Sequence, residues 1–176
     1  METQCSWLKQ HLYFGRQLTN IRILHSIPHQ NCFKFWSKYL YDLYQEASLP
    51  WAWHKELYDL AAEEGLVCFS SPFDHTAIDF LEELEAPIYK IASFEITDIP
   101  LIEYVASKGK PIILSTGIAE LSDIELALEA CRRMGNNDIA LLKCKSSYPA
   151  PIEEANMCMV RDLSERFGVI SGLSDH

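Results

Sequence analysis

Apolar runs of five or six residues alternate with longer segments of helical periodicity from about residue 37 to the end of the chain. Short apolar runs of this kind are typical of buried strands, and strands are predicted at 66–70, 87–92, 111–115, 139–144 and 168–173. The segments between them are predicted to be helical, at 53–65, 74–86, 98–110, 120–135 and 152–168. In the fourth helix we expect Ser122 to be the N-cap, Glu125 to complete a capping box and Gly135 to mark the end.

This alternation predicts an α/β fold. Short connections between successive strands and helices imply parallel strands joined by right-handed crossovers. Nearly continuous apolar strands fit a sheet that is covered on both faces. A doubly wound sheet and part of a (β/α)8 (TIM) barrel both satisfy the pattern. The chain contains neither G-x-x-x-x-G-K nor G-x-G-x-x-G, which disfavours the nucleotide-binding doubly wound fold.

A small hydroxyl residue ends or follows each predicted strand, at intervals of 22 to 31 residues. These residues are Ser71, Ser93, Ser115, Ser146 and Ser174. The carboxyl ends of barrel strands converge on one mouth, where active sites are built. Five hydroxyls at such a mouth would form a cradle for a phosphate group. The alternative is that each serine only caps the helix that follows it.

Two charged residues lie beside these hydroxyls. Lys90 is inside an apolar strand, where an amine is unfavourable unless it is paired or faces a ligand. Lys90 and Ser93 could therefore hold a phosphate, and Glu95, just past the strand end, could transfer a proton. The alternative is a structural ion pair between Lys90 and Glu95.

The last residues, Asp175 and His176, could belong to a metal site. The Asp175 carboxylate could orient the His176 ring, although a terminal histidine can also be inert. Because one histidine does not make a metal site, we expect the other ligands to lie beyond the chain end. On the preceding loop, which also holds Ser146, Tyr148 could contact a sugar through its hydroxyl, or its ring could simply pack beside Pro149.

Charge separates the first 35 residues from the rest of the chain. They carry four basic side chains and one acidic one, a net charge of +3, whereas residues 36–176 carry eleven basic and 24 acidic ones, a net charge of −13. The acidic body argues against a nucleic-acid partner. We therefore expect 1–35 to be a separate N-terminal segment and 36–176 to be the barrel domain.

Composition is that of a soluble globular protein, with 48% apolar and 23% charged residues. The sequence shows no apolar run of about 18 residues and no signal-peptide pattern, so we expect neither a membrane span nor secretion. The six cysteines are scattered, without a C-x-x-C motif. This usage predicts reduced thiols and a cytoplasmic protein.

Four stretches resemble the sialic acid synthase family: FSSPFD (69–74), YKIASFEITDIPLIEYVASKGKPIILSTGIA (89–119), LLKCKSSYPAP (141–151) and GLSDH (172–176). The pseudaminic acid synthase branch is the most similar, on the evidence of LYDLYQEASLPWAWH (40–54) and KIASFE (90–95). The resemblance extends from about Trp36 to His176.

The resemblance implies a (β/α)8 barrel followed by a small antifreeze-protein-like domain, in a protein that forms homodimers. Residues 36–176 would supply about five βα units, corresponding to strands three to seven, and the C-terminal domain would be absent. The implied reaction condenses phosphoenolpyruvate with an open-chain 2,4-diacetamido-trideoxy hexose, releasing phosphate and forming a nine-carbon sugar acid. A divalent metal ion, Mn²⁺ or Mg²⁺, would polarise the sugar aldehyde.

The resemblance also implies roles for individual residues. Positions that bind phosphoenolpyruvate correspond to Ser71, Lys90, Ser93, Ser115 and Ser174, with Lys90 and Glu95 as the catalytic pair. Ser146 and Tyr148 correspond to positions near the sugar, and His176 to a metal ligand. Ser146 departs from the asparagine that some members carry.

Three interpretations of function remain open at this point. In the first, the chain is a truncated pseudaminic acid synthase that is inactive on its own, because five βα units leave two open sheet edges and an incomplete metal site. In the second, it is a fragment of an N-acetylneuraminate or legionaminate synthase. In the third, it is a non-catalytic module that binds a phosphosugar.

Overall fold

A computed structural model describes residues 48–146 and 151–174, which fall in two compact units. One unit contributes residues 48–68 and the other residues 69–146 and 151–174. The predicted boundary at residue 35 lies outside the described residues and stays a prediction.

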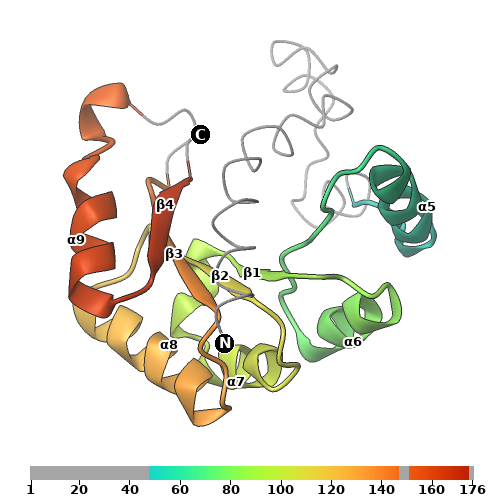
Figure 1. Cartoon of the computed structure of the whole chain (residues 1–176), viewed down its shortest axis with the longest axis horizontal. Helices are drawn as coiled ribbons and strands as arrows, with labels where there is room; N and C mark the ends of the chain where they lie inside the picture. The colour runs from blue at the N-terminus through green and yellow to red at the C-terminus, as the bar shows by residue number, and fades with distance from the viewer. Residues whose placement is uncertain (1–47, 147–150, 175–176) are drawn as a thin grey trace, which may run out of the picture. The chain divides into compact units, whose positions relative to one another are not determined.

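The larger unit is built on a parallel sheet of four strands in the order β1-β2-β3-β4 (Figure 1). The strands are β1 (Tyr89–Ile91), β2 (Ile112–Ser115), β3 (Ile139–Cys144) and β4 (Ile170–Ser174). Each pairs in parallel with the next strand along the chain, which confirms four of the five predicted strands and their parallel topology.

The fifth predicted strand, 66–70, is reduced to one parallel bridge between Ser70 and Tyr89. The Lys90 amide donates to the Ser70 carbonyl at 3.3 Å. A segment at the edge of a sheet gains ladder hydrogen bonds from one side only, so apolar composition did not suffice to make this segment a regular strand.

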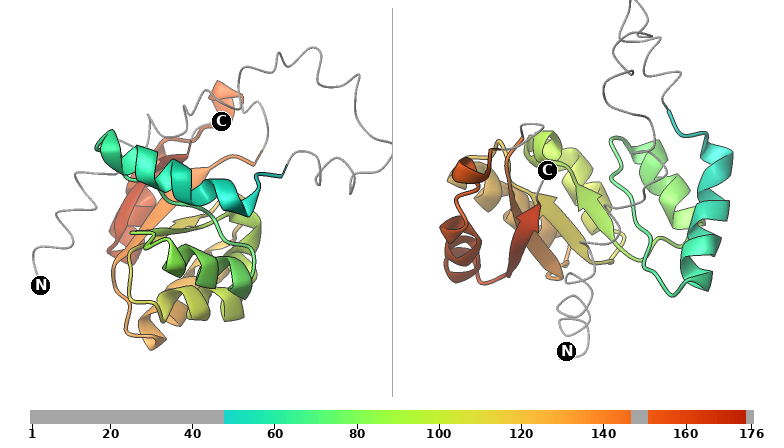
Figure 2. Two further views of the ribbon diagram at one scale, coloured as in Figure 1. Left: turned by 90° about the vertical axis from the view of Figure 1, so that its right-hand side faces the viewer. Right: turned by 90° about the horizontal axis from the view of Figure 1, so that it is seen from above.

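The helices of this unit lie along the outside of the curved sheet (Figure 1), and Figure 2 shows α9 running beside β3 and β4. They are α6 (His75–Glu83), α7 (Ile99–Ala106), α8 (Leu121–Arg133) and α9 (Cys158–Phe167), with short 3₁₀ helices η1 (Ser93–Thr97) and η2 (Ile152–Glu154). This arrangement of parallel strands inside and helices outside is that of a partial (β/α)8 barrel.

Alternation along the strands divides helix-facing from interior side chains. Tyr89 and Ile91 are fully buried, and the Tyr89 hydroxyl donates to Glu82 and to the Ile78 carbonyl, both on α6. Because successive side chains point to opposite faces, Lys90 points to the interior of the barrel. The same alternation places Ser115, Cys144 and Ser174 on the interior side of β2, β3 and β4.

Acidic residues, not the strand-end serines, are the N-caps of α6, α7 and α8. Asp74 accepts from the Ala77 amide at 2.8 Å and caps α6, and Asp98 accepts from the Leu101 amide at 3.1 Å and caps α7. None of the helices in the described ranges has one of the five serines as its N-cap. The capping interpretation is therefore wrong for Ser71, Ser93, Ser115 and Ser146, and it is untested for Ser174, because no described helix follows that residue.

The predicted start of α8 is also wrong, by two residues. The N-cap is Glu120 instead of Ser122, and the Asp123 carboxylate accepts from the Glu120 amide at 2.9 Å in a capping box. Glu120 and Asp123 provide the hydrogen bonds of the first helical turn, so the helix begins before Ser122, and both Ser122 and Glu125 lie inside it. The predicted end is confirmed, because Gly135 follows the helix with a φ of 78°.

The segment 152–168 forms two helices where one was predicted. Asn156 lies between η2 and α9 with a φ of 43°, in the left-handed region that asparagine tolerates better than most residues. A residue in this conformation interrupts the helical hydrogen-bond ladder, which hydrophobic periodicity alone does not report.

The smaller unit is described through α5 (Trp51–Glu63), which confirms the helix predicted at 53–65. Lys55 and Asp59 form an exposed i,i+4 ion pair on it at 2.7 Å. The four cysteines within the described residues of the two units are free thiols, as predicted. None of the helices in the described part of the chain is long and apolar enough to cross a membrane.

Candidate active site

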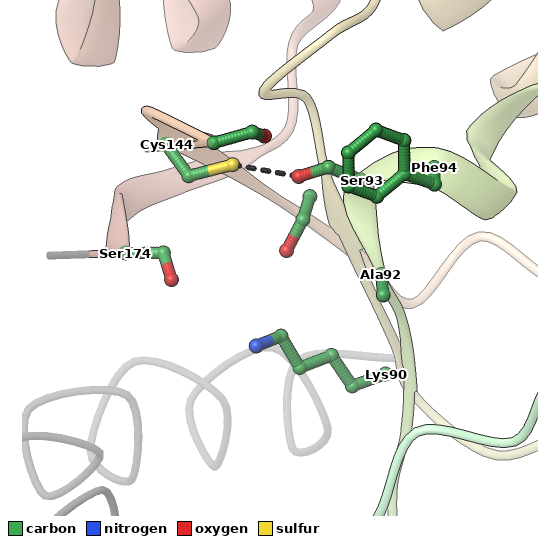
Figure 3. Close-up of a pocket in the computed structure, with 8 residues that line it drawn as sticks. Lys90, Ala92, Ser93, Phe94, Cys144 and Ser174 are labelled. Atoms are coloured by element: carbon green, nitrogen blue, oxygen red, sulfur yellow. Dashed lines mark hydrogen bonds between the residues drawn. The ribbon is translucent and has the colours of Figure 1, made fainter. Parts of the chain in front are cut away.

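A cavity of about 100 Å³ opens at the carboxyl ends of the four strands (Figure 3). The residues that line it are Lys90, Ala92, Ser93, Phe94, Ser115, Cys144, Ser146 and Ser174. The structure thus brings together five residues singled out from the sequence, and every strand of the sheet contributes at least one of the lining residues. The parallel register explains this, because Ser115 pairs with Leu142 and Cys144 with Ser174 at one end of the sheet.

Lys90 supplies a positive charge inside this cavity. Its side chain is half-buried and extends away from β1 into the open space (Figure 3). Within the described residues it forms no ion pair with Glu95, so the structural ion-pair interpretation is wrong. A half-buried amine without a carboxylate partner is suited to receive an anion.

Ser115 adds a hydroxyl that lacks a protein partner. Its side chain is 3% exposed, and its Oγ makes no hydrogen bond to any described residue. Buried polar atoms are almost always paired, and an exception calls for an explanation. A ligand oxygen in the adjoining cavity would supply the missing partner.

Glu95 lies near the cavity but does not line it. It is on η1, two residues after Ser93, and its Oε2 atom is buried without a hydrogen-bond partner among the described residues. Ser71 is half-buried next to the bridge residue Ser70 and does not line the cavity either. Tyr148 and His176 lie outside the described residues, so their predicted roles stay predictions.

Gly117 lies close to three side chains that line the cavity, those of Ser93, Cys144 and Ser146. The Gly117 amide donates to Ser93 Oγ at 3.2 Å, and Ser93 Oγ lies 2.8 Å from Cys144 Sγ. A Cβ atom at residue 117 would lie 2.4 Å from Ser146 Oγ and 2.6 Å from Cys144 Sγ. Only glycine leaves room for these three side chains to meet.

The turn that carries Gly117 is fixed to the neighbouring strand. The Thr116 amide and hydroxyl both donate to the Leu142 carbonyl, at 2.9 and 3.1 Å. These bonds hold the end of β2 against β3, so that Ser115 and Gly117 keep their positions relative to Cys144.

Sequence reasoning missed four members of this site: Ala92, Phe94, Gly117 and Cys144. Cys144 is the last residue of the strand predicted at 139–144, and its place at a strand end was a signal that the sequence offered. The position of Gly117 depends on the path of the turn after β2, and hydrophobic periodicity holds no information about that path.

The described residues do not provide a metal site. They contain no group of three or more histidine, cysteine, aspartate or glutamate side chains that could hold an ion. The predicted ligand His176 is not among them.

The sequence profile of the NeuB family matches residues 17–176. The pseudaminic acid synthase of Helicobacter pylori is 55% identical over 137 residues, which are 78% of this chain and 40% of that protein. The N,N'-diacetyllegionaminic acid synthase of Campylobacter jejuni is 40% identical over 75% of this chain and 40% of its own. The chain spans about two fifths of the length of these curated relatives.

Solved structures give the same result. The spore coat polysaccharide biosynthesis protein SpsE of Bacillus subtilis superposes with a TM-score of 0.72 at 36% identity, over 78% of this chain and 39% of that one. The N-acetylneuraminic acid synthetase of Leptospira borgpetersenii superposes with a TM-score of 0.73 at 32% identity, over 77% of this chain and 47% of that one. The partial-barrel fold and the resemblance predicted from the sequence are both confirmed, and the chain belongs to the NeuB family.

Proposed function

We propose that this chain carries part of the active site of a sugar acid synthase that joins phosphoenolpyruvate to an open-chain acetamido sugar. The observation that carries the proposal is the pairing, in one cavity, of the Lys90 amine, which has no ion-pair partner among the described residues, with the buried, unpartnered Ser115 hydroxyl. Phosphoenolpyruvate has a phosphate and a carboxylate, and both are acceptors for such donors. Membership of the NeuB family supports this choice of anion.

In this proposal the cavity residues bind and orient the anion. Lys90 neutralises charge on phosphoenolpyruvate, and the hydroxyls of Ser93, Ser115 and Ser174 donate to its oxygens. Donors fixed on strand ends need little reorganisation when charge develops, which favours the transition state over the free substrate. Ser71 would contribute from the neighbouring segment.

Glu95 would move a proton. Its buried Oε2 lacks a partner among the described residues, and it follows Ser93 by two positions. The carbon–carbon bond would form between the methylene carbon of phosphoenolpyruvate and the sugar aldehyde carbon, whose oxygen takes up a proton. Water would then add to the resulting cation, and the tetrahedral product would lose phosphate. Glu95 would donate or accept a proton in these steps.

His176 is the one residue of this chain that we propose as a ligand of a divalent metal ion. When bound, Mn²⁺ or Mg²⁺ would polarise the sugar aldehyde. The described residues do not complete its ligand set, so the steps above depend only on the side chains of this chain.

A 2,4-diacetamido-trideoxy hexose is the sugar that we favour. The pseudaminic acid synthases of Helicobacter pylori and Campylobacter jejuni are 55% and 42% identical to this chain, whereas the mouse N-acetylneuraminate-9-phosphate synthase is 31% identical. The Phe94 ring, 66% exposed at the cavity, offers an apolar surface to the deoxy part of such a sugar. Ser146 and Tyr148 would bind its hydroxyl or acetamido groups.

Titration calorimetry with phosphoenolpyruvate tests the proposal. We expect the purified chain to bind it and Lys90→Met to weaken binding at least about tenfold, since one charge-assisted contact is lost. Lys55→Met is the matched control, because it removes the same charge from an exposed ion pair on α5. Absence of binding by the wild-type chain, or equal losses in the two variants, would overturn the proposal. Binding of a phosphosugar in preference to phosphoenolpyruvate would favour the non-catalytic module instead.

A further inference from the structure

The Ser93 hydroxyl has two protein neighbours whose chemistry limits what it can do next. Ser93 begins η1 after β1, and Cys144 ends β3, 51 residues later. Their side-chain atoms, Oγ and Sγ, lie 2.8 Å apart, and the Gly117 amide donates to the same Oγ at 3.2 Å. Cys144 is 2% exposed and lines the cavity.

A serine hydroxyl has one proton to donate and two lone pairs that accept. A backbone N–H can only donate, so Gly117 occupies one lone pair of Ser93. The remaining question is the direction of the bond with Cys144. If Ser93 donates to the sulfur, its only proton is used within the protein and it cannot donate to an anion. If the thiol donates to Ser93, both lone pairs are filled and the hydroxyl proton is available to the cavity.

The surroundings of Ser93 favour the thiol as the donor. Sulfur is both a weak donor and a weak acceptor, so the chemistry of the pair alone does not fix the direction of the bond. The cavity beside Ser93 holds the Lys90 amine and the Ser115 hydroxyl, which has no partner among the described residues, and this set of donors suits a ligand with acceptor atoms only. A Ser93 hydroxyl that donates adds a third donor to this set, whereas one that only accepts would repel the same ligand.

The packing shows that this contact is built into the site. A Cβ atom at residue 117 would lie 2.8 Å from Ser93 Oγ and 2.6 Å from Cys144 Sγ, so the pair can form only beside a glycine. The Thr116 hydrogen bonds to Leu142 hold that glycine against β3. The position of the Ser93 hydroxyl is thus determined by three segments distant in the sequence.

We propose that Cys144 is a positioning residue whose thiol donates to Ser93 Oγ and thereby commits the Ser93 hydroxyl to donate to an anionic substrate. The identity of that anion, a phosphate or carboxylate of phosphoenolpyruvate, rests on the proposed function. The direction of the Cys144–Ser93 hydrogen bond does not, and it can be measured in the free protein.

Infrared spectroscopy of the S–H stretch measures this direction. Subtracting the spectrum of Cys144→Ala from that of the wild-type chain isolates the Cys144 band. We expect this band at the lowered frequency of a donating thiol, and we expect Ser93→Ala to raise it. The Cys131 band, isolated with Cys131→Ala, is the control, since Cys131 is buried on α8 and should not respond to Ser93→Ala. A Cys144 band at the frequency of a free thiol, unchanged by Ser93→Ala, would refute the proposal.

Phosphoenolpyruvate binding tests the consequence for the site. We expect Cys144→Ala to raise the Kd by about three- to tenfold, because the Ser93 hydroxyl loses the hydrogen bond that orients it, and Cys144→Ser, which can still donate, to restore the Kd to within about twofold of the wild type. If Cys144 had only a structural role, Cys144→Ala and Cys144→Ser proteins with the same thermal unfolding midpoint would bind phosphoenolpyruvate with the same Kd. Equal affinity of Cys144→Ala and wild type would contradict the proposal. If the wild-type chain fails to bind, the proposed function is wrong, and the infrared result alone decides the direction of the hydrogen bond.

Discussion

Gly117→Ala adds one methyl group against three side chains that line the cavity. The new carbon would lie 2.4, 2.6 and 2.8 Å from Ser146 Oγ, Cys144 Sγ and Ser93 Oγ. Ordinary contacts of this kind are at 3.4 Å or more, so each neighbour must move by about 0.6 Å or more. The effect is steric only, because Gly117 is not among the glycines with positive φ.

The three neighbours do not yield equally. Ser146 is half-buried and can rotate, whereas Cys144 is 2% exposed and its sulfur is in contact with Ser93. Overpacking of a well-packed site costs about 1–3 kcal/mol, and loss of glycine flexibility in the unfolded chain offsets about 0.4–1 kcal/mol of this. We expect a net destabilisation of about 1–2 kcal/mol, or roughly 2–8 °C in Tm for a chain of this length.

Thermal unfolding followed by circular dichroism gives the stability change, and calorimetry with phosphoenolpyruvate gives the change in binding. We expect Gly117→Ala to weaken binding more than about tenfold, because the Ser93–Cys144 pair is displaced. Gly172→Ala is the matched control, since its Cβ would meet only the flexible Leu142 side chain, at 3.1 Å, away from the cavity. A Gly117→Ala protein with the affinity and Tm of the wild type would refute the steric argument.

Three further predictions concern other parts of the larger unit. Asn136 is 5% exposed and bridges two loops through Lys110 O at 2.8 Å and the Asp138 amide at 3.0 Å, so Asn136→Ala should lower the urea-derived free energy of unfolding by about 2 kcal/mol; a loss below about 0.5 kcal/mol would contradict this. Burial works to raise the pKa of Glu82, but hydrogen bonds from Lys110 and Tyr89 outweigh it and hold that pKa below its usual value. A carboxyl group whose pKa is lower in the folded protein than in the unfolded chain stabilises the protein at pH values above its unfolded pKa, and this stabilisation is lost on acidification. Glu82→Gln should therefore lower Tm at pH 7 but much less below about pH 4; a difference in Tm that does not depend on pH would contradict this. Burial raises the pKa of the Cys131 thiol to about 12, whereas Cys158 is exposed. In a thiol titration at pH 8, Cys158→Ser should therefore have one rapidly reacting thiol fewer than the wild type, and Cys131→Ala should have the same number; rapid reaction of Cys131 would disprove this.

The strand ends could be predicted from the sequence because parallel register follows from simple rules. Once apolar runs and helices alternate, the carboxyl ends of the strands must meet, and the residues there become neighbours. Lys90, Ser115 and Ser174 lie at one cavity for this reason. Lys90 was recognisable in addition because an amine inside an apolar strand needs an explanation.

Features decided by local geometry could not be predicted in the same way. The start of α8 depends on whether Glu120 or Ser122 supplies the cap, and both residues are compatible with the helical periodicity. The break at Asn156 depends on one backbone dihedral angle. The contact of Gly117 with Ser93 and Cys144 joins three separate segments, and its distances emerge only when the chain is folded.

The buried Ser115 hydroxyl also sets stability against function. A buried donor that lacks a partner destabilises the protein that carries it by roughly 1–3 kcal/mol, and a bound anion removes that penalty. Ser115→Ala should therefore make the free protein more stable and, under the proposed function, weaken its binding of phosphoenolpyruvate.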